Sequence, residues 1–201
     1  VAQDTGLGQA VEIAHIREGL ERVSEEEILQ TYFLKTTRYT IESPLMLGAI
    51  LSGAGHRVER ALGEFAQPLG LAFQIENDLH EIESLTGQNK ERAYDLHAGV
   101  KTLFLKKLYL ELSPEEQTRM ALLLSETNTS ELASLMRSEP ARRITRELRN
   151  EVARCYKEAR RALRTQALNP TQRERLLDFV EFISLNSHHS EAASQVRAAS
   201  A

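Results

Sequence analysis

The sequence predicts an all-α protein, and three observations support this. The chain of 201 residues is rich in Leu, Ala, Glu and Arg, which are good helix formers, and has only 10 Gly and 5 Pro. Apolar residues recur three and four positions apart in several segments, which is the period of a helix with one buried face. No segment shows the alternation of a half-buried strand. We therefore expect a bundle of antiparallel helices joined by short loops.

The composition restricts the classes of function. With 41% hydrophobic residues, 27% charged residues and a net charge of −4, the chain has no general attraction to nucleic acid or membranes. No apolar run approaches the roughly 20 residues of a membrane span, and no signal peptide is visible. Cys155 is the single cysteine, so an internal disulfide is excluded and a small packed residue is expected. These features indicate a cytoplasmic protein.

The first clear helix start is a capping box, in which Ser24 is followed three positions later by Glu27. Helical periodicity then continues through Tyr39. Ser43-Pro44 is expected to break or kink this helix. Residues 45–51 are almost all apolar, so we expect this segment in the centre of the protein and not at its surface.

The next elements are separated by glycine-containing turns. A long, mostly buried helix is expected over residues 58–80. Residues 86–90 have the composition of a loop, and Gly99 marks another turn. An amphipathic helix is then expected over residues 103–112.

The last third of the chain continues the helical pattern. Its expected elements are a helix beginning at Pro114, a turn and cap at residues 127–130, a long helix over 142–168, a last helix from Pro170 to about Leu185, and a flexible tail over 187–201. The arginine-rich part has interleaved glutamates, so a solvated helix with ion pairs explains it better than a nucleic-acid-binding face.

The most informative stretch is residues 73–81, where an apolar helix acquires several acid and amide groups. On a helix, Asn77 and Glu81 lie one above the other and Asp78 lies beside them. Burying such groups is costly without compensation, and a divalent metal with oxygen ligands is one form of compensation. A helix end that turns into solvent explains the same pattern, and the spacing does not decide between the two.

Four other patterns carry groups that could bind an anion. They are Gly8-Gln9 followed by Glu12, Lys35-Thr36 within an apolar helix, Gln74, and the segment from Asp95 to Leu103 that contains Lys101. Each one alone has an ordinary explanation, such as a solvated lysine or a structural amide. Together they predict a metal–diphosphate site, because acids hold Mg²⁺ on a diphosphate while lysines and amides neutralise the remaining charge. Apolar helix walls would then hold a hydrocarbon chain.

The order and spacing of these patterns resemble the C-terminal part of the trans-isoprenyl diphosphate synthases, the polyprenyl synthetase family. Gly8-Gln9 with Glu12 is similar to the family's Gly-Gln-x-x-Asp segment, and Lys35-Thr36 to its Lys-Thr helix. Residues 69–75 are similar to the segment that leads into the family's second aspartate-rich motif, and residues 77–81 stand at the position of that motif. The form is closest to bacterial short-chain geranylgeranyl and farnesyl diphosphate synthases.

The resemblance covers residues 6–185. It implies a single polyprenyl synthetase domain, of which residues 1–186 are the C-terminal part, with a helical bundle of the isoprenoid synthase type. The family's activity is the Mg²⁺-dependent condensation of an allylic diphosphate with isopentenyl diphosphate. Two or three Mg²⁺ ions are held there by the substrate diphosphate and acidic residues.

The resemblance also implies roles for matching positions. Asn77, Asp78 and Glu81 would bind Mg²⁺. Lys35 and Gln74 would contact the allylic diphosphate, with Thr36 supporting them, and Lys101 would be a further catalytic residue that neutralises charge. Phe73 would line the isoprenoid pocket, and Gln9 and Glu12 would lie at its edge.

The chain departs from the family pattern at several of these positions. Asn77 replaces the first carboxylate of the second motif, and Glu81 has a longer side chain than the usual Asp. Gln88 replaces a loop lysine, and Val100 stands where a lysine normally follows glycine, with Lys101 one place later. The first aspartate-rich motif is absent, so N-terminal helices are apparently missing and the 201-residue polypeptide alone is expected to be inactive.

Several explanations of these departures stay open. The chain could be part of a longer prenyltransferase that works as a homodimer. It could be a non-catalytic or regulatory partner of a complete synthase, or a diverged relative with another diphosphate chemistry, such as terpene cyclisation. An unrelated helical interaction protein is the remaining alternative. None of them requires a nucleic acid partner or a membrane span.

Overall fold

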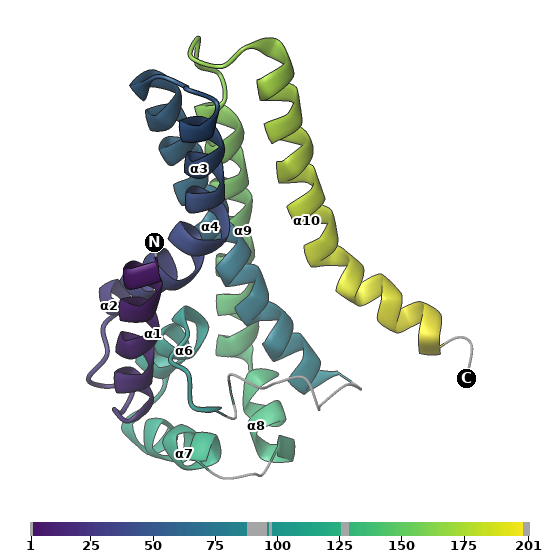
Figure 1. The fold of residues 1–201 in the computed structure, drawn as a ribbon. Coiled ribbons are helices and arrows are strands. Elements are labelled where there is room, and N and C mark those ends of the chain that lie inside the picture. Colours follow the sequence, from purple (N-terminus) through teal and green to yellow (C-terminus); the bar gives the residue numbers. More distant parts are fainter. Residues whose placement is uncertain (1, 88–95, 97, 126–128, 199–201) are drawn as a thin grey trace.

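The computed structural model describes residues 2–87, 96, 98–125 and 129–198, and every regular element in this part is helical (Figure 1). The predicted all-α fold is therefore confirmed. The elements are, in chain order, α1 (Ala2–Ile16), α2 (Glu25–Tyr32), η1 (Phe33–Glu42), α3 (Ser43–Leu51), α4 (His56–Thr86), α6 (Leu103–Glu111), α7 (Pro114–Ser125), α8 (Thr129–Met136), α9 (Glu139–Ala162) and α10 (Pro170–Ala198).

Helices α4 and α9 form the centre of the bundle, and α4 also packs along η1. The two central helices run antiparallel, because Arg149 pairs with Glu83 while Tyr156, further along α9, donates to Glu76, which is earlier on α4. The long helix predicted over residues 58–80 is confirmed as the inner part of α4.

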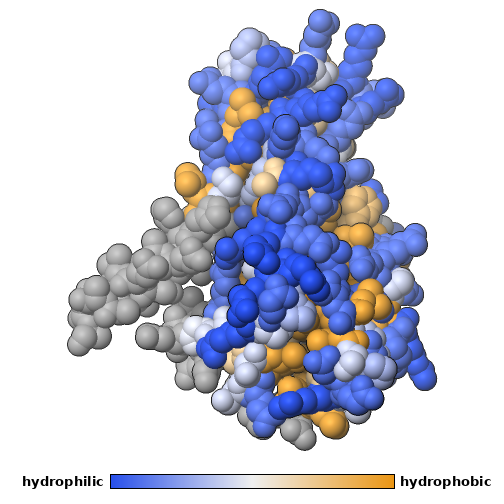
Figure 2. All heavy atoms as spheres, turned by 180° about the vertical axis from the view of Figure 1, so that it is seen from behind, coloured by the Kyte–Doolittle hydropathy of each residue, from blue (hydrophilic) through white to orange (hydrophobic). Residues whose placement is uncertain are grey.

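Helix α9 has one buried face and one charged face. Its buried residues recur every three or four positions and include Ile144, Leu148, Val152, Cys155 and Ala159. Arginines on the other face form ion pairs with glutamates, so the predicted solvated helix is confirmed. Seen from behind, hydrophilic side chains cover most of the molecule and hydrophobic ones gather mainly toward its lower end (Figure 2).

The bounds of α9 differ from the predicted range of 142–168. The helix begins at Glu139, because the Ser138 side chain accepts from the Ala141 N–H and Pro140 lies in the first turn. It ends at Ala162 with Leu163 as its C-terminal cap.

The helix start predicted at Ser24 is confirmed, because Ser24 and Glu27 cap each other reciprocally. From Phe33 onward the hydrogen-bond pattern widens into the π-helix η1, which has ten residues. The chain does not break at Ser43-Pro44, so of the two predicted outcomes the break is wrong and the kink stays a prediction. The backbone stays helical there while the π pattern returns to α, and Pro44 lies in the first turn of α3, where its missing N–H costs little.

Two glycines allow η1 to pack closely between its neighbours. A Cβ atom on Gly8 would lie 2.9 Å from the Leu34 Cβ and 3.0 Å from the Lys35 backbone nitrogen. A Cβ atom on Gly70 would lie 2.7 Å from the Thr37 Cα atom. Because backbone atoms are involved on both sides, α1 and α4 hold η1 at a short distance that a larger residue would increase.

The prediction that residues 45–51 lie in the centre of the protein is wrong. Leu47, Ile50 and Leu51 of α3 are 58%, 63% and 78% exposed, and Ala49 is the buried residue of this helix. The segment is apolar on all sides, whereas within the described residues it packs mainly against η1 and α4. One side of an apolar helix therefore stays uncovered by this part of the chain.

The C-terminal helix also differs from the prediction. It was expected to end near Leu185, but α10 continues to Ala198 because residues 191–198 are mostly good helix formers. The flexible tail over residues 187–201 stays a prediction. The turn predicted at Gly99 is present, with φ of 78°, whereas the predictions for Gln88 and Asp95 lie outside the described residues.

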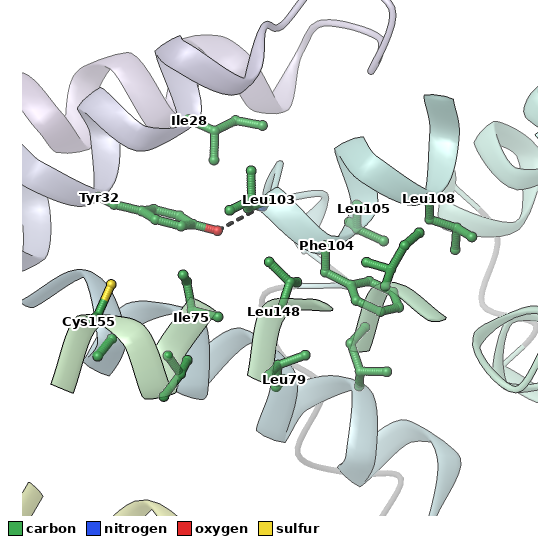
Figure 3. Packing of buried hydrophobic residues seen from close by; sticks show 14 of the residues in the cluster. Ile28, Tyr32, Ile75, Leu79, Leu103, Phe104, Leu105, Leu108, Leu148 and Cys155 are labelled. Atoms are coloured by element: carbon green, nitrogen blue, oxygen red, sulfur yellow. Dashed lines mark hydrogen bonds between the residues drawn. The ribbon is translucent and has the colours of Figure 1, made fainter. Parts of the chain in front are cut away.

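The hydrophobic core lies between α2, α4, α6 and α9 (Figure 3). Ile28 and Ile75 lie on either side of the Tyr32 ring, and the Tyr32 hydroxyl points toward the first residue of α6, Leu103 (Figure 3). The Tyr32 ring is therefore packed among apolar side chains, while its hydroxyl lies close to the segment that carries the predicted site.

Candidate functional site

Three elements that are distant in the sequence bring the predicted polar residues together. The Lys35 Nζ atom on η1 lies 2.8 Å from both carboxylate oxygens of Glu12 on α1, and Gln9 Nε2 donates to Glu12 over 3.0 Å. The side chains of Lys35 and Glu12 are 31% and 11% exposed. The lysine charge is therefore balanced within the chain, at a place that solvent still reaches.

Thr36, the next residue of η1, faces α4 instead of α1. Its hydroxyl donates to Gln74 Oε1 over 2.5 Å, and Gln74 Nε2 donates to Asp78 Oδ1 over 2.8 Å. Thr36 and Asp78 are each 6% exposed. The structure thus connects Lys35-Thr36, Gln74 and the acidic stretch, as predicted, while the roles of these residues in binding stay predictions.

Tyr32 is a residue of this site that the sequence reasoning missed. Its hydroxyl donates to Asp78 Oδ2 and accepts the Leu103 backbone N–H over 2.8 Å. Burial, and then the nearby Asp78 carboxylate, hold the pKa of Tyr32 well above its usual value. Tyr32 precedes Thr36 by four positions, so helical spacing was the available signal that the two share a face.

The three predicted metal ligands differ in burial and in their hydrogen-bond partners. Asn77 is exposed, both carboxylate oxygens of buried Asp78 accept side-chain hydrogen bonds, and Glu81 Oε2 accepts the Leu96 backbone N–H over 3.2 Å. Among the described residues, no group of three or more His, Cys, Asp or Glu side chains is placed to hold a metal ion. Mg²⁺ binding by Asn77, Asp78 and Glu81 stays a prediction.

Lys101 lies apart from this network. Its Nζ atom donates to the carbonyl oxygens of Gly99 and Ile16 over 2.8 and 3.4 Å, so it binds the end of α1. It lines a cavity of about 680 Å³ with residues of α7, and none of Lys35, Gln74 and Asp78 lines that cavity. Burial lowers the pKa of Lys101.

A second cavity, of about 530 Å³, lies beside Tyr32 and has Phe33, Leu71 and Cys155 in its wall. Cys155 is 1% exposed, and burial raises the pKa of its thiol to about 11. It is therefore a packed residue, as predicted, and not an activated thiol. Phe73, the predicted pocket residue, is half-buried and packs against the hydrophobic core.

Comparison with known proteins points to one family. The profile of the polyprenyl synthetase family matches residues 1–138. Heptaprenyl diphosphate synthase component 2 of Bacillus subtilis is 29% identical over 128 residues, which are 62% of this chain and 36% of that protein. Geranylgeranyl diphosphate synthase of Sulfolobus acidocaldarius is 33% identical over 119 residues, which are 57% of this chain and 34% of that protein. The chain thus spans about a third of the length of these relatives.

Solved structures share the fold. A decaprenyl diphosphate synthase from Rhodobacter capsulatus superimposes with a TM-score of 0.75 and 18% identity, over 92% of this chain and 57% of that chain. A geranylgeranyl pyrophosphate synthetase from Pyrococcus horikoshii gives a TM-score of 0.74 and 19% identity, over 90% of this chain and 54% of that one. The predicted bundle of the isoprenoid synthase type is therefore confirmed. In the described residues, no helix has both the length and the apolar character needed to cross a membrane.

Proposed function

Because this chain belongs to the polyprenyl synthetase family, we propose that it carries the diphosphate-binding part of a prenyltransferase site on η1 and α4. The whole protein would condense an allylic diphosphate with isopentenyl diphosphate into a geranylgeranyl- or farnesyl-type product. The observation that supports this is the junction of Lys35 and Thr36 with Gln74, which is 38 residues beyond Thr36 in the sequence.

Lys35 is the group proposed to bind the diphosphate. An ammonium group has three N–H donors, and a partly exposed lysine can exchange a carboxylate partner for a phosphate oxygen. Glu12 therefore keeps the lysine in place until an anion competes for it. The hydrogen bond from Thr36 orients the Gln74 amide, whose second N–H is the further donor that we assign to the diphosphate.

The remaining features of the proposal concern the whole protein. Dependence on Mg²⁺, a homodimer and a cytoplasmic location are supported by the family alone. We assign no step to Mg²⁺, since no group of three or more His, Cys, Asp or Glu side chains among the described residues is placed to hold it. Half-buried Phe73, which adjoins Gln74, is the residue proposed to contact the hydrocarbon chain.

Calorimetric titration with inorganic pyrophosphate tests the binding part. The 201-residue chain is expected to bind pyrophosphate, and Lys35→Gln to weaken binding about tenfold or more, because a charge-assisted contact is lost. Lys107→Gln is the matched control, since Lys107 also pairs with a glutamate, Glu147, over 2.8 Å. Equal weakening by both variants, or no binding at all, would contradict the proposal.

A second candidate function is a non-catalytic partner of a complete synthase. Two observations favour it: Asn77 stands where the family motif has a carboxylate, and both oxygens of Asp78 are engaged within the chain. Turnover of labelled isopentenyl diphosphate with Mg²⁺ separates the two candidates. We expect none from residues 1–201 alone. Turnover by the intact gene product would favour the enzyme, and inactivity until a synthase is added would favour the partner.

A further inference from the structure

Two chains of hydrogen bonds end on the same buried carboxylate. From one side, Thr36 donates to Gln74, which donates to Asp78 Oδ1. From the other side, the Leu103 N–H donates to Tyr32, which donates to Asp78 Oδ2. Every donor points toward Asp78, so the bonds in each chain polarise and strengthen one another.

This arrangement gives Asp78 the compensation that a buried carboxylate needs. A carboxylate that is 6% exposed is strongly destabilising unless its oxygens are hydrogen-bonded or bound to a cation. Here the oxygens are each bonded to a side chain, and Tyr32, which is also 6% exposed, adds a charge-assisted bond. These hydrogen bonds compensate the buried charge from within the chain.

The Tyr32 hydroxyl also solves a local problem at the start of α6. The first N–H groups of a helix have no partner within it, and an unpaired N–H is costly where the residue is buried. Leu103 is 5% exposed and begins α6, while Thr102 caps the Leu105 N–H over 3.2 Å. Tyr32 therefore supplies the partner that Leu103 lacks, and it links α6 to α4 (Figure 3).

We propose that Asp78 is a structural hydrogen-bond acceptor that joins η1, α4 and α6 through Gln74 and Tyr32, and that these bonds, and not a bound cation, compensate its buried charge in this chain. This proposal does not depend on whether Lys35 binds a diphosphate.

Urea unfolding of the 201-residue chain, with and without millimolar Mg²⁺, tests it. Tyr32→Phe and Asp78→Asn are each expected to raise the unfolding equilibrium constant about tenfold or more. The double variant should raise it by much less than the product of the two factors, because both substitutions act on the same bond. Mg²⁺ should change the unfolding constants of the wild type and of both variants by the same small factor.

Opposite results would overturn the proposal. These are strong stabilisation of the wild type by Mg²⁺ that is lost in Asp78→Asn, or an unfolding constant of Tyr32→Phe equal to that of the wild type. If Asp78→Asn does not fold, Tyr32→Phe carries the test by itself. Tyr156→Phe is the matched control, because it removes another tyrosine–carboxylate bond of α4 and leaves Asp78 untouched.

Discussion

Helix α4 has two buried tyrosine–carboxylate bonds on different sides. Tyr32, the last residue of α2, donates to Asp78, and Tyr156 of α9 donates to Glu76, two positions earlier on α4. Residues two apart on a helix point in nearly opposite directions. The acids are 6% and 7% exposed, so the two bonds are similar in chemistry and burial.

The two bonds differ in what surrounds them. Tyr156 joins α4 to α9, two helices that already pack along each other and are also joined by the ion pair between Arg149 and Glu83. Tyr32 connects three elements, and its bond continues through Asp78 to residues of the proposed site. The same pair of groups therefore adds to extensive helix packing on the α9 side, whereas on the Tyr32 side it links three elements that pack less extensively.

The largest expected effect comes from breaking the approach of η1 to α4. Gly70→Ala would place a Cβ atom 2.7 Å from the Thr37 Cα, so η1 must shift away from α4. This shift would also disturb the hydrogen bond between Tyr32 and Asp78. We expect the free energy of unfolding to fall by about 3 kcal/mol or more, measured by urea denaturation. Gly48→Ala is the control, since a Cβ atom there meets nothing within 4 Å. Equal stability of the two variants would exclude a tight contact at Gly70.

A smaller loss is expected when the opposite bond is removed. Tyr156→Phe should lower the free energy of unfolding by about 1–2 kcal/mol, because Glu76 loses one hydrogen bond while the α4–α9 packing stays. The loss should be smaller than that of Tyr32→Phe, which removes one hydrogen bond from Asp78 and also removes the partner of the Leu103 N–H. Urea denaturation of both variants under the same conditions measures the difference in the free energy of unfolding. A larger loss in Tyr156→Phe than in Tyr32→Phe would contradict the expected order.

A smaller effect on stability is expected at alkaline pH, from the buried thiol of Cys155 on α9. The pKa of Cys155 is raised from 9.0 to about 11, so above pH 9 the unfolded chain loses this proton while the folded chain keeps it. Folding stability therefore falls as pH rises from about 9 to about 11, by about 1 kcal/mol at pH 10. Cys155→Ala should remove this part of the pH dependence of the unfolding free energy. An unchanged pH dependence in the variant would contradict the burial of the thiol.

The smallest effect is expected at the exposed edge of the site. Glu12→Gln removes the charge that competes for Lys35, so the affinity for pyrophosphate should rise a few-fold. Stability should change by less than about 1 kcal/mol, as is usual for a partly exposed ion pair. Calorimetry measures the affinity, with Glu25→Gln as the control because Glu25 pairs with Lys107. Weaker binding in Glu12→Gln would show that Glu12 supports the anion site.

The structural features that depend only on residues close together in the sequence were predicted correctly. The capping box of Ser24 and Glu27 and the period of α9 are local patterns, so they predicted helix positions well. The exposure of residues 45–51 was not predictable in this way, because it depends on what covers α3 and not on the composition of α3.

The candidate site shows the same limit. Family motifs identified Lys35, Thr36 and Gln74, and the structure joins Thr36 to Gln74 and Lys35 to Glu12. Helical spacing placed Asn77, Asp78 and Glu81 together, yet it could not show which of them turns inward. The partner that decides the state of Asp78 is Tyr32, 46 positions earlier, and a contact of that kind depends on how the helices pack.

The exchange rate of the Leu103 backbone amide with deuterium tests the central claim most directly. If Tyr32 holds α6 to Asp78, Tyr32→Phe should speed exchange at Leu103 about tenfold or more, and Tyr156→Phe should leave it unchanged. The Leu105 amide, bonded to Thr102 within the same turn, serves as the internal reference. Leu103 exchange in Tyr32→Phe at the wild-type rate, or equal acceleration in both variants, would contradict the account.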